Sequence, residues 1–287
     1  MTISIYLKKS DEWLFGHIAR DLAEKIGIEV TEYPKGLSYL LSDPRGCVGY
    51  KAYIPLDAIE IASDKRLIEN RFFLNGVNRP KTWLLEESAA VQRLLEQNKD
   101  SRFIIKYPTS CGASGHYICK GKFDQKKNWP LPYLVQEFVE LETPKVYRVY
   151  MVNGEYVGSN VRKFPDGIKN DLVAHAKGAR YYYDETVDEA GIAEAIKALY
   201  ATGLSSSFGV VDLIRKYDSW LVLEVGTDGI YNHVDRDFDN ASLYNKLHEM
   251  ISSDIIYKSA QHGDFGISSA EACSDDIENI GMEKGAL

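Results

Sequence analysis

Asp212 and Glu224 each lie in an apolar, strand-like segment, and residues 217–219 separate the two segments. If these three residues form the turn of an antiparallel hairpin, Lys216 pairs with Trp220, and Asp212 lies directly opposite Glu224. Like charges in that arrangement destabilise a sheet, so a cation between the two carboxylates is expected. Mg²⁺ fits best because it prefers carboxylate oxygens and usually binds together with phosphates. A half-exposed hairpin with scattered acidic residues is the competing interpretation.

A loop of small residues follows an apolar, strand-like segment that ends at Lys106. The loop contains Ser110, Gly112, Ser114 and Gly115, and such residues let backbone N–H groups approach an anion closely. The pattern therefore predicts phosphate binding. The loop lacks the spacing of a P-loop and of a Rossmann turn, so an ordinary turn beside a lysine that reaches solvent is the alternative.

The composition is typical of a globular protein that does not bind polyanions. The chain has 287 residues, of which 45% are hydrophobic and 26% are charged, and its formal net charge is -8. Its basic residues form no cluster, so we expect neither nucleic acid nor a membrane as the main partner, and small molecules or peptides fit better. The length predicts two or three lobes.

The four cysteines form no CxxC pair, and none has the spacing to histidine that is typical of a zinc site. Four cysteines in a chain of this length are not a disulfide framework, so we expect a cytoplasmic protein. The first residues contain no charged region followed by a long apolar stretch. Neither a signal peptide nor a transmembrane helix is therefore predicted.

Hydrophobic periodicity predicts an α/β protein. Asn153 and Gly154 give the strongest hairpin signal, between predicted strands 146–152 and 155–162. The polar, glycine-rich residues 258–287 predict a disordered or loosely docked tail. The other predicted strands are 3–7, 28–33, 102–107, 117–120, 133–139, 208–216 and 220–225, and the predicted helices are 11–26, 64–74, 87–97 and 187–202.

The order of these segments resembles the ATP-grasp family over residues 60–236. Within it, the resemblance is to the carboxylate–amine ligase type, as in ribosomal-protein-S6–glutamate ligases and D-alanine–D-alanine ligases. Five motifs carry the resemblance. Asp64-Lys65 with 76–82 looks like the lead-in to the first ATP-contacting lysine, and Phe103-Ile-Ile-Lys106 with 110–115 looks like the second lysine with its mobile loop. Leu134-Val-Gln-Glu-Phe-Val139 looks like the hinge strand, 147–157 with Arg162 looks like the central hairpin and its arginine, and Val211-Asp212 to Glu224 looks like the metal hairpin.

The resemblance implies a site for ATP and Mg²⁺. Arg162 would stabilise the transferred phosphoryl group, and Lys106 and Arg148 would be catalytic with it. Asp212, Glu224 and Asp228 would hold the metal. The residues expected to bind the nucleotide are Lys65, Lys106, Ser110, Gly112, Ser114, Gly115, Gln136, Glu137, Phe138, Val139 and His175, with adenine held mainly by backbone groups of 136–139.

One departure from the family pattern concerns the metal. The family usually places Asn two residues after the second metal carboxylate, but this position is Gly226 here. Asp228 is the nearest replacement by charge, and Asn232 is the alternative. The change leaves open a reduced or absent affinity for the metal.

Two further departures concern the nucleotide. The acidic residue that commonly contacts the ribose aligns with Val146 or Lys145, neither of which is acidic. On the phosphate side, either Asn170 or His175 would occupy the position of a family asparagine. A histidine in such a place is otherwise more often a surface or hydrogen-bonded residue.

The resemblance implies an ATP-dependent ligase that joins a carboxylate to an amine through an acyl phosphate, with an amino acid or peptide as substrate. The alternatives are a small-molecule kinase on the same fold and a catalytically reduced protein that binds a nucleotide or a peptide. We expect an N-terminal α/β lobe (1–62), a central lid lobe (63–140) and a C-terminal lobe with the metal hairpin (141–257), with ATP between antiparallel sheets. The oligomeric state is open, and a homodimer is one of its options.

Overall fold

The computed structural model describes most of the chain between residues 3 and 227 and short parts beyond. The described residues are 3–12, 16, 19–21, 23–24, 27–35, 37–40, 51–52, 54–124, 128–168, 170–227, 245–246, 248–250 and 252–253. Asp228, Asn232 and the predicted tail 258–287 lie outside them, as does part of the predicted helix 11–26. In the described part, no helix is both long and apolar enough to cross a membrane.

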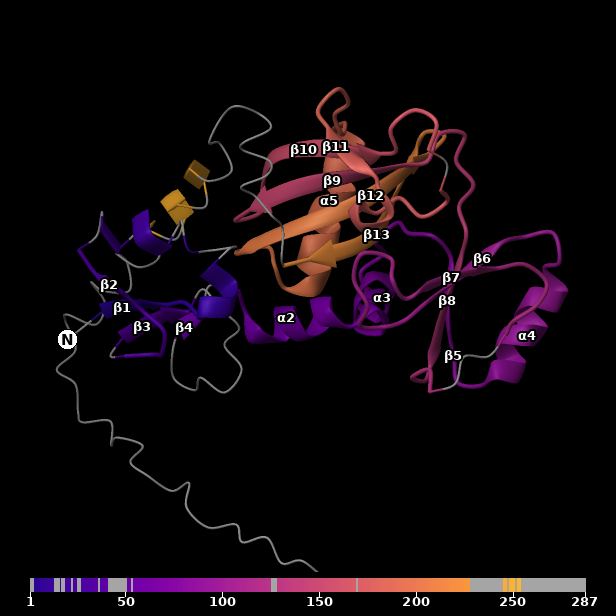
Figure 1. Ribbon diagram of the computed structural model, residues 1–287, viewed down its shortest axis with the longest axis horizontal. Helices are drawn as coiled ribbons and strands as arrows, with labels where there is room; N and C mark the ends of the chain where they lie inside the picture. Colours follow the sequence, from indigo (N-terminus) through magenta and orange to yellow (C-terminus); the bar gives the residue numbers. More distant parts are fainter. Residues whose placement is uncertain are drawn as a thin grey trace, which may run out of the picture.

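The first sheet, here called the N-terminal sheet, has four parallel strands in the order β2-β1-β3-β4. Figure 1 shows it at one end of the molecule, next to α2 (Leu56–Ser63). The predicted strands 3–7 and 28–33 are confirmed, whereas β3 and β4 are not among the predicted strands. The bounds are β1 Ile3–Tyr6, β2 Glu29–Thr31, β3 Leu37–Leu40 and β4 Lys51–Ala52, and the 3₁₀ helix η1 spans Lys9–Asp11.

The second sheet, here called the central sheet, is antiparallel with the order β5-β8-β6-β7. Helix α4 (Ser88–Gln97) covers one face, because its Val91 and Leu95 are buried in one apolar cluster with Phe103 and Ile105. Side chains alternate along a strand, so Lys106 points to the opposite face. The strands are β5 Thr82–Leu85, β6 Phe103–Lys106, β7 His116–Cys119 and β8 Tyr133–Glu137.

The third sheet, here called the C-terminal sheet, is antiparallel with the order β11-β10-β9-β12-β13. The predicted hairpin at Asn153 and Gly154 is confirmed, since both residues have positive φ (51° and 75°), as a two-residue type I′ turn requires. The strands are β9 Lys145–Val152, β10 Glu155–Lys163, β11 Arg180–Tyr182, β12 Phe208–Lys216 and β13 Ser219–Gly226, and the 3₁₀ helix η2 spans His175–Lys177.

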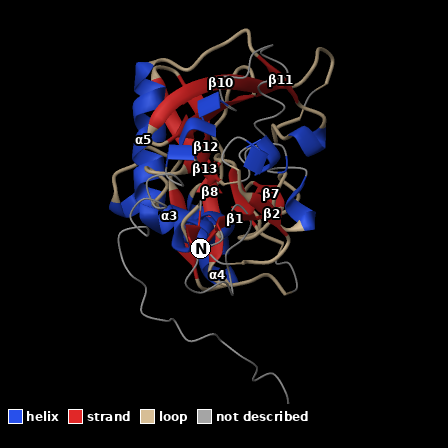
Figure 2. Ribbon diagram, turned by 90° about the vertical axis from the view of Figure 1, so that its left-hand side faces the viewer, coloured by secondary structure: helices blue, strands red, loops and turns tan. Residues whose placement is uncertain are grey.

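Helix α5 (Glu189–Thr202) begins at Asp188, whose side chain accepts a hydrogen bond from the Gly191 N–H, and ends at the left-handed Gly203. In Figure 2 it stands along one side of the C-terminal sheet. Its Ala198 and Leu199 belong to the same buried cluster as β9 and β12 residues such as Val149 and Val211. The opposite face of the sheet is therefore the one available for a site.

Helices α2 and α3 (Lys65–Leu74) connect the N-terminal sheet to the rest of the protein. They lie along the C-terminal sheet in Figure 1, and Ala58, Ile68 and Phe72 join the buried cluster of that sheet. Asp64 accepts a hydrogen bond from the Arg66 N–H (2.8 Å) and so caps α3 at its N-terminus. This cap fixes the position of Lys65, the first residue of the helix.

The hairpin of β12 and β13 has the predicted pairing of Asp212 with Glu224 but not the predicted turn. Lys216 pairs with Ser219, so the turn has two residues rather than three. The register then shifts by one, because Leu213 pairs with Val222 while Asp212 pairs with Glu224. A β-bulge therefore restores the pairing that a three-residue turn would have given.

Candidate active site

A row of polar residues crosses the C-terminal sheet on the face away from α5. Asn160 of β10 pairs with Arg148 of β9. Arg148 also pairs with Asp212 of β12, which in turn pairs with Glu224 of β13. Directly opposite residues share a face of the sheet. Arg162 lies two residues after Asn160 and shares that face, so four predicted site residues from four strands lie on one side.

Asp212 lies between two arginines. Its Oδ1 accepts a hydrogen bond from Arg148 Nε (2.7 Å), and its Oδ2 accepts one from Arg148 Nη2 (3.0 Å) and one from Arg162 Nη2 (2.9 Å). Only 6% of Asp212 is exposed, and burial by itself would raise its pKa. The charges and hydrogen bonds of the two arginines outweigh burial and hold the pKa of Asp212 well below its usual range. The residue is therefore an anion at neutral pH.

Glu224 is the more available of the two carboxylates. It pairs with Lys65, whose Nζ lies 3.0 Å from Glu224 Oε1, and 40% of its side chain is exposed. The described residues contain no group of three or more His, Cys, Asp or Glu side chains that could hold a metal. Two carboxylates nevertheless fit Mg²⁺ that arrives with phosphates, because the phosphates complete its coordination. Asp212 Oδ1 still has one free lone pair for it.

The predicted phosphate loop is closed at its base by a hydrogen bond from the Tyr107 N–H to the Gly115 carbonyl (2.7 Å). Lys65 Nζ donates to the Ser110 carbonyl (2.5 Å), which ties the loop to α3. Within the described residues, the N–H groups of Gly112 and Ala113 donate no hydrogen bond, and both residues have a φ of 58°. Unpaired N–H groups in a tight loop are suited to bind an anion.

Lys106 ends β6 directly opposite His116, the first residue of β7. Only 7% of Lys106 is exposed, and no hydrogen bond or ion pair joins its Nζ to another described residue. Burial lowers the pKa of Lys106 to about 8, against the opposing effect of the Glu224 charge. An uncompensated ammonium group in this position is suited to bind an anionic ligand.

A cavity of about 400 Å³ lies between the central and C-terminal sheets. Lys106, Arg148 and Asp212 each lie two residues along a strand from an apolar lining residue on the same face: Ile104, Val146 and Ile214. One end is therefore charged and contains the cations of Lys106, Arg148 and Arg162, since Arg162 reaches Asp212. The other end is apolar. Its volume lies within the range of about 300–1,000 Å³ that is typical of small-molecule sites. The residues lining the apolar end are Ile104, Val139, Leu141, Val146, Ile214 and Leu223.

The predicted hinge residues line this apolar end, but they do not all offer a free backbone N–H. The Glu137 N–H donates to the Lys81 carbonyl (2.8 Å), and the Phe138 N–H donates to the Arg102 carbonyl (2.9 Å). The Val139 N–H has no hydrogen-bond partner among the described residues. It is therefore the N–H group of this segment that can bind a base edge.

His175 lines the cavity, and its ring stacks on that of Tyr181 with the centroids 6.0 Å apart. Tyr181 in turn accepts a long hydrogen bond from Arg162 Nη1 (3.4 Å). Asn170, the alternative to His175, is not among the residues that line the cavity, and its side chain caps a local turn by accepting from the Leu172 N–H (2.9 Å). The geometry thus favours His175 over Asn170.

Carboxylates also lie at the mouth of the cavity, although the family position for one is occupied by Val146 or Lys145. Glu140 and Asp171 line the cavity, and Arg102 forms ion pairs with both. Lys145 also lines the cavity, and its Nζ pairs with Glu185 Oε1 (2.5 Å). Glu140 and Asp171 can therefore serve as acceptors for sugar hydroxyls.

The predicted site omits several residues that line the cavity, among them the polar residues His116, Tyr181, Glu140 and Asp171. His116 follows Gly115 directly, so the signal that predicts the loop could have included it. Asp171 lies between Asn170 and His175, the two residues that the resemblance offered for the phosphate side, but it was not itself predicted. Tyr181 lies where no strand is predicted, and its position depends on β11 pairing with β10, which is a long-range contact.

Comparisons with known proteins agree with this architecture. A family profile of the RimK-like ATP-grasp domain matches residues 62–251. The structure is similar to a D-alanine–D-alanine ligase from Bacillus anthracis, with 14% identity, a TM-score of 0.61 and coverage of 90% of this chain and 99% of that chain. It is also similar to the D-cycloserine synthetase DcsG, with 16% identity, a TM-score of 0.60 and coverage of 89% and 100%.

A third similar structure is that of the ATP-grasp ligase PsnB complexed with a minimal precursor, with 13% identity, a TM-score of 0.59 and coverage of 88% and 99%. At these identities, the likeness to the three structures establishes a shared fold. No curated protein sequence matches the chain.

Proposed function

This chain belongs to the RimK-like ATP-grasp family, and we propose that it is an ATP-dependent ligase that joins a carboxylate to an amine. The α/β architecture with two antiparallel sheets around a cavity is that of the family, so the predicted fold class is confirmed. The observation that carries the proposal is the polarity of the cavity. Its apolar end fits a purine base, and its cationic end fits phosphates.

The nucleotide would bind with its base at the apolar end. Ile104, Val146 and Ile214 would contact the base, and the Val139 N–H would donate a hydrogen bond to it. The phosphates would then lie at Lys106 and at the unpaired N–H groups of the loop. ATP is present in a complex of the D-alanine–D-alanine ligase, which has the same fold.

The two carboxylates of the β12–β13 hairpin would hold Mg²⁺. Glu224 would bind it first because Asp212 has a single free lone pair on Oδ1 and none on Oδ2. When bound, the ion supplies positive charge that neutralises the phosphate oxygens. Asp228, the third predicted ligand, stays a proposal because it lies outside the described residues. A complex of PsnB contains Mg and ADP.

The reaction would occur in two displacements. A carboxylate oxygen of the substrate attacks the γ-phosphorus of ATP, the bond to the bridging oxygen breaks, and ADP leaves. The amine nitrogen then attacks the acyl carbon, the bond to the phosphate oxygen breaks, and the amine loses a proton as phosphate leaves. Because the acyl phosphate also reacts with water, the lid formed by the loop 110–115 would protect it.

Arg162 is the residue best placed to stabilise the transferred phosphoryl group. Its Nη2 is held by Asp212, which fixes the guanidinium in the cavity (2.9 Å). Its Nε is buried and has no hydrogen-bond partner among the described residues. A fixed guanidinium with an unused N–H can bind the developing negative charge without reorganising. Arg148 supports the same region through its bidentate pair with Asp212.

We propose an amino acid or a peptide as the substrate. The family profile and the fold support this class in general terms, since PsnB is solved with a precursor peptide and DcsG is a D-cycloserine synthetase. Arg162 and Tyr181 lie at the cationic end of the cavity, where a substrate carboxylate can reach the terminal phosphate.

The proposal is tested by trapping the acyl phosphate with hydroxylamine. The protein, ATP, Mg²⁺ and hydroxylamine are incubated with a panel of amino acids and peptides, and hydroxamate and ADP are measured. The ligase is expected to form the two products in equal amounts, and only with the correct acid. ADP formation with a hydroxyl acceptor and no hydroxamate would instead indicate the kinase. Binding of ATP without turnover across the panel would indicate the catalytically reduced protein.

A further inference from the structure

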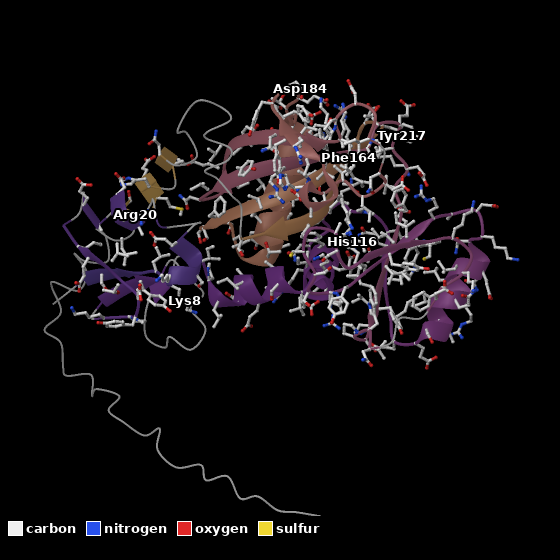
Figure 3. All side chains as sticks on the ribbon, in the orientation of Figure 1. Lys8, Arg20, His116, Phe164, Asp184 and Tyr217 are labelled. Atoms are coloured by element: carbon white, nitrogen blue, oxygen red, sulfur yellow. The ribbon has the colours of Figure 1, made fainter. Side chains whose placement is uncertain are left out.

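His116 lies at the cationic end of the cavity but has no role in the function proposed above. It begins β7 opposite Lys106 and lines the cavity next to Gly112 and Ala113 of the loop. Figure 3 shows it where the central sheet meets the C-terminal sheet. Its Nε2 is buried, and no hydrogen bond joins it to another described residue. A buried ring nitrogen without a partner calls for a physical explanation.

The charges around His116 are positive. Burial and the ammonium groups of Lys106, Lys65 and Lys177 lower its pKa to about 3, so the imidazole is neutral at pH 7. A neutral imidazole has one N–H donor and one acceptor nitrogen, whereas a lysine ammonium has donors alone. A phosphate offers acceptors alone, so the tautomer with the proton on Nε2 is the one in which this buried, unpaired nitrogen can bind it.

Among the described residues, no acceptor lies within hydrogen-bond distance of His116 Nε2. The N–H groups of Gly112 and Ala113 are also unpaired within the described residues. Lys106 Nζ also donates no hydrogen bond to another described residue. Four donors from the loop and two strands therefore belong to residues that line one cavity, and none of them has an acceptor among the described residues. A ligand with several anionic oxygens would satisfy them together.

We propose that the Nε2–H of His116 binds a phosphate oxygen of the nucleotide, an assignment that rests on the proposed function. A neutral donor adds a directed hydrogen bond at a place where three lysines already supply positive charge. The imidazole therefore fixes the orientation of the phosphate chain, whereas the lysines attract it. The bond is made with phosphates and not with the base or sugar.

The test measures binding rather than turnover. The affinities of ATP, ADP and adenosine are determined by calorimetry for the wild type and for His116→Leu. A hydrogen bond to a charged group contributes about 1.5–3 kcal/mol, so His116→Leu is expected to weaken ATP binding by roughly 10- to 100-fold. The affinity for adenosine should not change, because adenosine carries no phosphate.

Two further variants separate the hydrogen bond from the shape of the residue. In His116→Gln, the amide nitrogen can take the place of Nε2, so affinity for ATP should stay within a few-fold of the wild type. In His116→Asn, the side chain is too short for its amide nitrogen to reach the position of Nε2, so the variant should behave like His116→Leu. Tyr117→Phe is the matched control, because Tyr117 is the next residue and packs on the opposite face of the sheet with Val91 and Leu95.

Specific results would overturn the assignment. Binding of ATP by His116→Leu as tight as that of the wild type would show that Nε2 makes no bond to the nucleotide. Equal losses for ATP and adenosine would show a structural role, and equal behaviour of His116→Gln and His116→Leu would do the same. If calorimetry detects no binding of adenosine, ADP or ATP to the wild type, the proposed function itself is refuted.

Discussion

Lys106→Met is expected to stabilise the ligand-free protein while it removes nucleotide binding. Lys106 is 7% exposed, and its ammonium has no hydrogen-bond or ion-pair partner among the described residues, so folding removes it from water with only nearby charges such as that of Glu224 to compensate. Met has a similar length and no charge, and it fills the same space. Functional sites commonly contain residues that lower the stability of the ligand-free protein, and an unpaired buried ammonium is expected there because it binds the ligand.

The magnitude follows from the pKa of Lys106, which burial lowers from 10.5 to about 8. At about 1.4 kcal/mol for each pH unit, this difference corresponds to roughly 3 kcal/mol by which folding disfavours the charged form. Below pH 8, Lys106 is charged in both states, and the whole cost is present. As pH rises from 8 to the unfolded value of about 10.4, the folded state loses its proton first and the cost disappears.

The assay compares urea unfolding of the wild type and Lys106→Met at pH 7 and at pH 9.5. The free energy of unfolding of the variant should exceed that of the wild type by up to about 3 kcal/mol at pH 7, and the difference should narrow at pH 9.5. Calorimetry should show that the variant loses affinity for ATP. A variant that is less stable than the wild type at pH 7, or a difference that does not narrow, would refute the reasoning.

Three other substitutions give separate tests. Glu224→Gln should abolish ADP formation while the free energy of unfolding changes by no more than about 1 kcal/mol, since the Glu224 side chain is 40% exposed and Lys65 keeps its hydrogen bond to the Ser110 carbonyl; full activity would refute the metal role. Asp212→Asn should destabilise the protein by about 3–5 kcal/mol in urea unfolding, because two arginines lose their charge partner. The pKa of Asp212 is lowered, so this difference should be smaller at pH 3 than at pH 7, and a constant difference would contradict the ion pairs. Gly115→Ala should lower ATP affinity and turnover at least ten-fold, because its Cβ would overlap Ser110 and Tyr107 and open the loop; unchanged binding would show that the loop conformation does not matter.

Local signals predicted the elements that carry the site. The strand that ends at Lys106, the turn at Asn153 and Gly154 and the helices α3, α4 and α5 follow from periodicity, turn residues and caps, which act over a few residues. Helix α2 was missed because it follows Pro55 in a short segment whose apolar residues also suit a strand. The two-residue turn was missed because Tyr217 adopts a φ of 54°, which is uncommon for a tyrosine.

The pairing of Asp212 with Glu224 was predicted from a three-residue turn, which is wrong. The structure has a two-residue turn and a β-bulge that gives the same pairing, and no local sequence signal predicts this bulge. The ion-pair partners of these two carboxylates could not be predicted from the sequence. Arg148 and Arg162 reach Asp212 because β9 lies between β10 and β12, and Lys65 reaches Glu224 because α3 packs along the C-terminal sheet. Such partners depend on tertiary packing, so the sequence could supply the residue types of the site but not its ion pairs.

The most direct test of the central claim is a crystal structure of the protein with Mg²⁺ and a non-hydrolysable ATP analogue. The base should lie at the apolar end, with the Val139 N–H as its donor, and the phosphates should contact Lys106 and the N–H groups of the loop 110–115. Mg²⁺ should lie between the phosphates and Glu224. A nucleotide bound outside the cavity, or with its base at the Lys106 end, would contradict the account.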